Sequence, residues 1–137
     1  MGSVRVGERE LREWGREFGA RLSRPAVIAL SGELGSGKTT LVQAIAQGLG
    51  VELPVTSPTF ALVQRYDSPG GPMYHVDAYR LKPGDDVRDL GFDEMLSEPG
   101  AVVCVEWPER LGDAAPPFTH RLRLEHNGDE ARRLTVE

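Results

Sequence analysis

The first half of the chain carries two helix-like segments on either side of a short strand-like one. Within residues 8–22, apolar side chains recur at spacings of three and four, at Leu11, Trp14, Phe18 and Leu22. This spacing predicts an amphipathic helix. Residues 26–31 are a short apolar run, which predicts a buried strand. Residues 39–49 again show helical spacing, and Gly50 supplies a stop signal.

The second half predicts mainly strands separated by turns. Residues 60–66 and 73–79 flank the sequence DSPGGP, which predicts two strands joined by a turn. Residues 85–96 predict a helix broken near Gly91, and residues 101–107 predict a strongly apolar strand. The segments RLRLEH and RRLTVE flank NGDE and predict a closing hairpin. This order indicates an α/β fold with a mostly parallel central sheet, flanking helices and antiparallel hairpins.

Length and composition limit the class of protein. With 137 residues, 39% of them hydrophobic, we expect a single domain over residues 1–137. No apolar run approaches the roughly 20 residues that span a membrane. The lone cysteine, Cys104, lies in an apolar run, which indicates a buried thiol in a reducing compartment such as the cytoplasm. The net charge of −5 argues against this domain gripping nucleic acid by itself, although a partner could hold the nucleic acid.

The sequence GELGSGKTT between the first apolar strand and the next helix matches G-x-x-x-x-G-K-[ST]. Its fixed positions are Gly32, Gly37, Lys38 and Thr39. Glycines allow backbone N–H groups to converge on phosphate oxygens, and a helix N-terminus favours the same charge. We expect Lys38 to reach the β- and γ-phosphates and the Thr39 hydroxyl to bind Mg²⁺. Only Lys38 and Lys82 are lysines in a chain otherwise rich in arginine, which indicates a site that requires a compact ammonium.

Hydrolysis also requires a carboxylate opposite such a loop. Glu106 ends the last apolar strand, where ligands bind in open α/β sheets, and it is a candidate to hold Mg²⁺ or orient water. The alternative is a surface glutamate at a strand end. His75, Asp77 and Tyr79 alternate, so a strand would place all three on one face, with Asp77 toward the loop. Metal binding by His75 is disfavoured, because the other histidines are distant and no cysteine pair completes a set.

Two further segments are candidates for sensing the nucleotide or a partner. Thr56, Ser57 and Thr59 follow the second predicted helix, where nucleotide switches place a loop that senses the γ-phosphate. The alternative there is an ordinary proline turn. Trp107 follows Glu106 and is a candidate for packing or for contact with a partner.

In combination, these motifs resemble one family. GELGSGKTT, TSPTF, YHVDAYRL, LGFDEML and VVCVEWPERL are similar, in order and spacing, to the bacterial TsaE (YjeE) family of ATPase subunits in tRNA threonylcarbamoyladenosine synthesis. The resemblance covers residues 32–110. It implies a cytoplasmic P-loop ATPase that uses ATP and Mg²⁺ and acts with a carbamoyl-transfer subunit and the inactive paralogue of that subunit. Their product lies next to the anticodon in tRNAs that read codons beginning with A, so contact with tRNA is indirect.

The resemblance also implies roles for individual residues. Asp77 and Glu106 match the aspartate of H-x-D-x-Y-R and the glutamate of E-W-P, which implies catalytic roles, with Thr39 and Glu106 on the metal. At the N-terminal helix the chain departs from the family pattern, and Glu8 is the candidate for contact with adenine. The matching nucleotide cradle comprises Glu33, Leu34, Gly35, Ser36, Gly37, Lys38, Thr39 and Thr40.

Two other functions remain open from the residues alone. A small-molecule P-loop kinase would need an acceptor pocket and a lid with arginines, for which this chain has little room. A nucleotide-gated adaptor would bind ATP and partners with little turnover of its own. GTP is disfavoured, since no N-K-x-D-type motif follows the last predicted parallel strand.

Overall fold

The protein is described by a computed structural model that covers residues 2–33, 35–52, 54–55, 62–82, 90–128 and 130–137. Its strands are β1 (Gly2–Val6), β2 (Ala26–Gly32), β3 (Val63–Tyr66), β4 (Met73–Asp77), β5 (Val102–Glu106), β6 (His120–His126) and β7 (Arg132–Val136). Its α-helices are α1 (Glu8–Arg21), α2 (Lys38–Leu49) and α3 (Phe92–Ser97). Short 3-10 helices follow two of the strands, η1 (Ala78–Arg80) and η3 (Pro108–Ala114).

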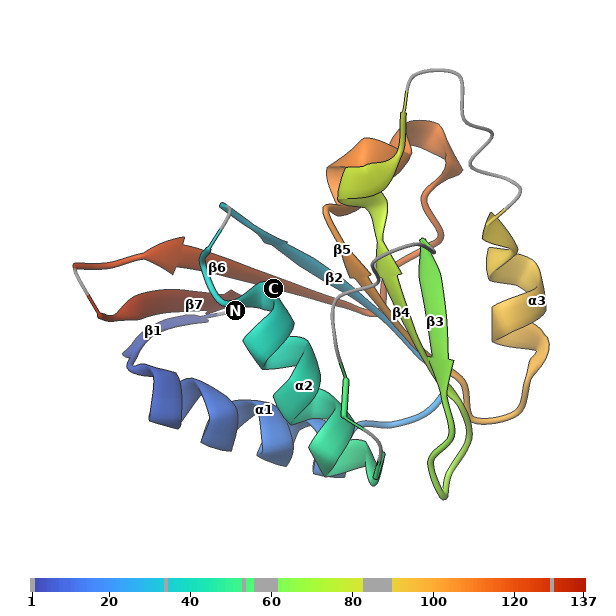
Figure 1. The fold of residues 1–137 in the computed structure, drawn as a ribbon, viewed down its shortest axis with the longest axis horizontal. Coiled ribbons are helices and arrows are strands. Elements are labelled where there is room, and N and C mark those ends of the chain that lie inside the picture. Colours follow the sequence, from blue (N-terminus) through green and yellow to red (C-terminus); the bar gives the residue numbers. More distant parts are fainter. Residues whose placement is uncertain (1, 34, 53, 56–61, 83–89, 129) are drawn as a thin grey trace.

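All the strands form one seven-stranded sheet in the order β1-β7-β6-β2-β5-β4-β3 (Figure 1). The central strands β6, β2, β5 and β4 are mutually parallel, whereas β3 and the pair β7 and β1 add antiparallel edges. The expected mostly parallel sheet with antiparallel hairpins is therefore confirmed. The parallel arrangement brings the carboxyl ends of β2, β4 and β5 to the same edge of the sheet, where the candidate residues lie.

Each face of the sheet has its own apolar core. Alternate residues of β2 and β5, such as Ile28 and Cys104, pack with Leu41 and Ile45 of α2 on one face. On the other face, Val103 and its neighbours pack with residues of α3 and η3. Figure 1 shows α1 and α2 lying together, away from α3. Because β2 and β5 are covered on both faces, they are apolar without interruption, as the sequence indicated.

Helices α1 and α2 pack closely through glycines. Gly15 and Gly19 of α1 are buried, and a Cβ atom at Gly48 of α2 would lie 2.1 Å from the Arg16 carbonyl oxygen. The predicted apolar stripe is real, but Trp14 and Phe18 lie at the flank of the core and are only partly buried. The glycines, rather than the large side chains, therefore set the distance between the two helices.

Some boundaries differ from the sequence expectation. Strand β4 ends at Asp77 instead of 79, because the Asp77 side chain accepts a hydrogen bond from the Tyr79 backbone N–H (3.1 Å) and caps η1. Tyr79 therefore does not share a strand face with Asp77, and that part of the prediction is wrong. Gly91, with φ of 78°, is the N-cap residue of α3 and does not lie inside the helix. Residues 83–89 of the expected helix lie outside the described residues. Strand β1 was not predicted.

Among the described residues, no helix is both long enough and apolar enough to cross a bilayer.

Candidate nucleotide site

The glycine-rich loop joins the carboxyl end of β2 to the first residue of α2. Gly32 has φ of 147° and Gly37 has φ of 104°, backbone conformations that favour glycine. A Cβ atom at Gly32 would also lie 2.3 Å from the Leu124 carbonyl oxygen, so the loop passes tightly over β6. Helix α2 begins at Lys38, as expected, and its N-terminus faces the loop. Leu34 lies outside the described residues.

Lys38 turns back onto the loop that precedes it. Its ammonium donates hydrogen bonds to the carbonyl oxygens of Gly32 (2.5 Å) and Glu33 (2.9 Å), and lies 4.2 Å from the centre of the Trp107 ring. The residue is only 5% exposed. This burial lowers the pKa of Lys38, while nearby carboxylates, Glu106 foremost, oppose the shift. The ammonium is thus held by carbonyl oxygens and the Trp107 ring at the place where a phosphate is expected.

The two candidate carboxylates come together beside Lys38. Asp77 of β4 is in register with Glu106 of β5, so both side chains project from the same face of the sheet. They line one hollow of about 380 Å³ with Lys38, Thr39 and other residues of the loop and helix. The structure therefore brings together the loop, the metal-binding candidates and the catalytic candidates predicted from separate parts of the sequence.

Glu106 is a buried carboxylate, which excludes the alternative of an exposed strand-end glutamate. It is 5% exposed, and its Oε2 lies 2.5 Å from Nε2 of His75, which is fully buried. The Nδ1 atom of His75 has no hydrogen-bond partner within the part of the chain that the structure describes. His75 is therefore hydrogen-bonded to a carboxylate of the site.

Trp107 and Tyr79 form the rim of the same hollow. Their ring centroids are 4.9 Å apart, and the guanidinium of Arg110 lies 4.7 Å from the Tyr79 ring centre. Trp107 adopts a left-handed conformation with φ of 59°, which a non-glycine residue seldom takes. This conformation ends β5 abruptly and lays the ring near Lys38. Trp107 accordingly packs on the site, while contact with a partner stays a prediction.

Arg132 belongs to the site but was missed in the sequence. It lies on β7, and its guanidinium donates to the carbonyl oxygens of Ser36 (Nε, 2.9 Å) and Gly35 (Nη2, 3.3 Å). Strand alternation offered a signal, since Arg132 shares a face with the buried Leu134. An arginine on the inward face of a strand requires polar partners. In this fold the phosphate loop supplies them.

A second hollow of about 570 Å³ adjoins the first and shares Gly37, Thr40 and Arg132 with it. Glu8 and Leu11 of α1 line it on the other side. Glu8 is exposed, and Arg12 donates a hydrogen bond to its Oε1 at 3.4 Å. The structure thus places Glu8 beside the loop, next to the first hollow, which contains Lys38, Asp77 and Glu106 and is called the phosphate-side hollow below.

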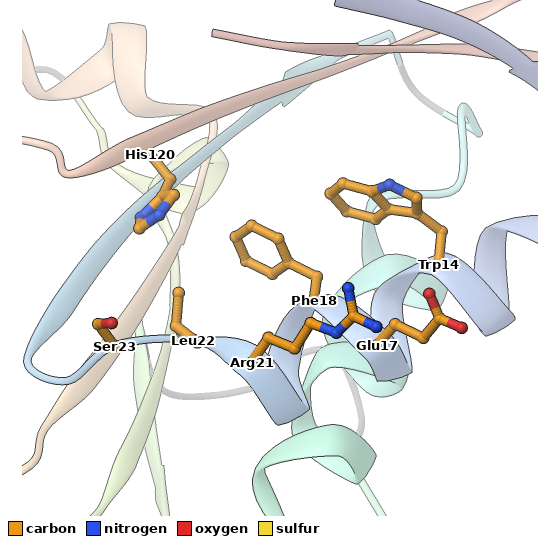
Figure 2. A pocket seen from close by; sticks show the side chains of 7 residues that line it. All are labelled: Trp14, Glu17, Phe18, Arg21, Leu22, Ser23 and His120. Carbon is orange, nitrogen blue, oxygen red and sulfur yellow. The ribbon is translucent and has the colours of Figure 1, made fainter.

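A third hollow lies away from the loop and contains no predicted site residue. Figure 2 shows Trp14, Phe18 and His120 in a row above α1. Trp14 and Phe18 stack at 5.0 Å, and Phe18 meets His120 edge-on at 5.3 Å. His120 begins β6, whereas the loop follows the end of the parallel strand β2. This hollow therefore opens toward the opposite edge of the sheet.

The residues present fit a Mg²⁺-nucleotide. Among the described residues, no group of three or more His, Cys, Asp or Glu side chains could hold a metal alone. Magnesium at phosphate sites usually binds through one or two carboxylates together with phosphates and water. Thr39 and Glu106 fit that pattern.

The buried Ser36 Oγ also lacks a hydrogen-bond partner in the described part of the chain, as expected of a loop shaped for an added group. The candidates Thr56, Ser57 and Thr59 fall in residues that the structure leaves undescribed.

Comparison with known proteins agrees with these features. The profile of the family "Threonylcarbamoyl adenosine biosynthesis protein TsaE" matches residues 6–134. The chain belongs to the TsaE family. A TsaE protein of Streptomyces coelicolor is 42% identical, over 92% of this chain and 88% of its own. One from Treponema pallidum is 36% identical over 99% of both chains.

A solved structure extends the comparison to the fold. The crystal structure of Bacillus subtilis YdiB has a TM-score of 0.76 and 28% sequence identity, covering 98% of this chain and 84% of the other. As a member of the TsaE family, the chain is a tRNA threonylcarbamoyladenosine biosynthesis protein. The family and the P-loop type of fold indicate nucleotide binding. The resemblance found in the sequence motifs is thereby confirmed.

Proposed function

We propose that this TsaE chain is a single-domain, cytoplasmic P-loop ATPase that binds and hydrolyses Mg²⁺-ATP for threonylcarbamoyladenosine formation in tRNA. The observation that carries the proposal is the convergence of Lys38, Thr39, Asp77 and Glu106 on one hollow. A phosphate loop alone accounts for binding. The two carboxylates beside the loop supply what hydrolysis further requires, namely a metal ligand and a group that orients water.

Each residue has a role that follows from its position. The loop from Glu33 to Thr40 would surround the phosphates with backbone N–H groups, and Lys38 would leave its carbonyl partners to contact the β- and γ-phosphates. Thr39 and Glu106 would hold Mg²⁺, which when bound neutralises charge that develops on the phosphates. Asp77 would orient or deprotonate the attacking water, since it lines the hollow next to Glu106.

The nucleoside would occupy the second hollow. That hollow shares Gly37 and Thr40 with the phosphate side, so a nucleotide could span both. Glu8 can accept a hydrogen bond from an exocyclic amino group such as that of adenine. Leu11, a core residue of α1, lies beneath the same hollow. This arrangement supports ATP as the substrate.

We expect slow turnover by the isolated chain. The guanidinium of Arg110 lies over Tyr79 and that of Arg132 binds loop carbonyls, so neither serves as an arginine finger in this arrangement. A finger supplied by a partner is worth about three to five decades of rate in other P-loop enzymes.

The partners we propose are the carbamoyl-transfer subunit and its inactive paralogue, with ATP hydrolysis resetting the complex. Their tRNA product carries the modification next to the anticodon, in tRNAs that read codons beginning with A.

The test is ATP hydrolysis by the chain alone, with both partner subunits, and with the subunits and tRNA. Asp77→Ala and Glu106→Ala should each lower hydrolysis by at least about a hundredfold while nucleotide still binds. Glu109→Ala, which removes an exposed carboxylate near the site, is the matched control. Parent-like hydrolysis in both site variants would refute the assignment.

The same preparations test the alternatives. Phosphate transfer from ATP to a panel of small acceptors would favour a kinase. Binding of ATP and partners with no hydrolysis under any condition would favour a nucleotide-gated adaptor.

A further inference from the structure

We propose that His75 is a positioning residue whose Nε2–H fixes the carboxylate of Glu106 for its work in the nucleotide site. The inference rests on the proposed function, because it assigns a supporting role toward a residue of that site. It starts from the 2.5 Å contact between Nε2 of His75 and Oε2 of Glu106. Both residues are buried, at 0% and 5% exposure.

The sheet explains why these side chains meet. His75 on β4 is in register with Cys104 on β5, and Glu106 lies two residues beyond Cys104 on the same face. Such diagonal neighbours on adjacent strands lie within reach of long side chains. The contact therefore depends on the pairing of β4 with β5 and requires no special loop conformation.

The position of His75 separates it from the nucleotide. Glu106 lines the phosphate-side hollow with Lys38 and Asp77, whereas His75 does not. His75 thus lies behind the carboxylate and can act only through it. When one carboxylate oxygen of Glu106 is held by His75, the other oxygen stays directed at the hollow. Without this hydrogen bond, the Glu106 side chain would sample other rotamers.

The two ring nitrogens of His75 differ: Nε2 meets Glu106, whereas Nδ1 has no hydrogen-bond partner among the described residues. An ionised carboxylate only accepts hydrogen bonds, so Nε2 must carry the hydrogen that meets Glu106. Nε2 of His75 is therefore the ring nitrogen that donates to Glu106.

Substitution by two amides tests this role. The side-chain nitrogen of His75→Gln can approach the position of Nε2, while that of His75→Asn is too short to reach Glu106. Loss of such a supporting hydrogen bond typically costs about 10- to 100-fold in metal affinity or activity. His75→Asn should therefore lower kcat and raise the Mg²⁺ concentration required for nucleotide binding, both in that range. Binding of ATP without Mg²⁺ should change little, and His75→Gln should recover most of both losses.

Two further measurements exclude a purely structural explanation. In a Glu106→Gln background, His75→Asn should lower kcat no further, because a positioning residue acts through its partner. Nitrogen NMR of the nucleotide-free protein should show a hydrogen on Nε2 of His75. Thermal unfolding of each variant reports whether it folds.

The outcomes separate this inference from the proposed function. If Glu106→Gln hydrolyses ATP at the parent rate, the proposed function fails and this inference fails with it. If Glu106→Gln is impaired while His75→Asn is equal to the parent or to His75→Gln, only the positioning role is overturned. Equal losses from His75→Asn with and without Glu106, or an Nε2 that carries no hydrogen, would overturn it as well.

Discussion

Arg132 provides the sharpest test of how the fold supports the site. Its guanidinium bridges β7 to the carbonyl oxygens of Ser36 and Gly35, so it braces the phosphate loop while also lining the nucleotide hollow. Arg132→Ala removes both hydrogen bonds and leaves the residues of the loop unchanged. We expect the loop to sample other conformations and nucleotide affinity to fall, because only the ordered loop binds well.

The structure sets the size of this effect. A hydrogen bond from a charged donor contributes about 1.5 to 3 kcal/mol when buried. The bond to Ser36 is partly buried and the bond to Gly35 is exposed, so solvent screening reduces both. We therefore expect about 1 to 2 kcal/mol in total, or a dissociation constant for ATP about 5- to 30-fold higher. Arg132→Lys should lie between, since an ammonium lacks the planar fork.

Arg133 is a matched control one residue away. It points to the opposite face of β7, and among the described residues its guanidinium donates to Ser3 Oγ alone, at 3.3 Å. Titration with ATP should therefore give parent affinity for Arg133→Ala and weaker binding for Arg132→Ala, with similar thermal stability of the two variants. Equal affinities would refute the bracing role. If Arg132→Ala and Arg133→Ala lost ATP affinity and thermal stability to the same extent, Arg132 would stabilise only the hairpin of β6 and β7.

Three positions, Lys38, Gly48 and Cys104, give further predictions on stability and reactivity. Lys38→Met should raise the free energy of unfolding at neutral pH and abolish nucleotide binding. This gain in stability should shrink as the pH rises toward 10.5, because the pKa of Lys38 is lower in the folded than in the unfolded chain. Between these two pKa values the unfolded chain binds more protons, so the parent protein becomes more stable with rising pH. Gly48→Ala should lower stability by about 1 to 3 kcal/mol in urea unfolding, because its Cβ would overlap Arg16, whereas the exposed Gln47→Ala should not. Burial raises the pKa of Cys104 to about 12, so a thiol reagent should react with it only after unfolding.

The sequence predicted the phosphate loop and central sheet because their signals are local. The spacing of Gly32, Gly37 and Lys38 specifies a loop conformation by itself, and short apolar runs specify strands buried on both faces. The meeting of Asp77 with Glu106 was predictable in outline, since parallel strands end at one edge of the sheet. These inferences required no knowledge of strand order.

Features that depend on pairing between distant segments could not be predicted in the same way. Strand β1 exposes most of its side chains, with only Val6 buried, and exists through its pairing with β7. Arg132 reaches Ser36 only because the closing hairpin places β6 beside β2. The bond between His75 and Glu106 likewise requires β4 to neighbour β5. In each case the missing information was strand order, which periodicity does not contain.

The resting state of Lys38 links the stability of the fold to its function. Its ammonium is buried against carbonyl oxygens and the Trp107 ring, and its lowered pKa means that these contacts replace water incompletely. A bound phosphate brings negative charge next to the ammonium and compensates for its lost hydration. The parent protein should therefore gain stability on adding ATP, by an amount set by the ratio of ATP concentration to dissociation constant. Lys38→Met should start more stable and gain nothing, so its advantage over the parent should shrink as ATP is added.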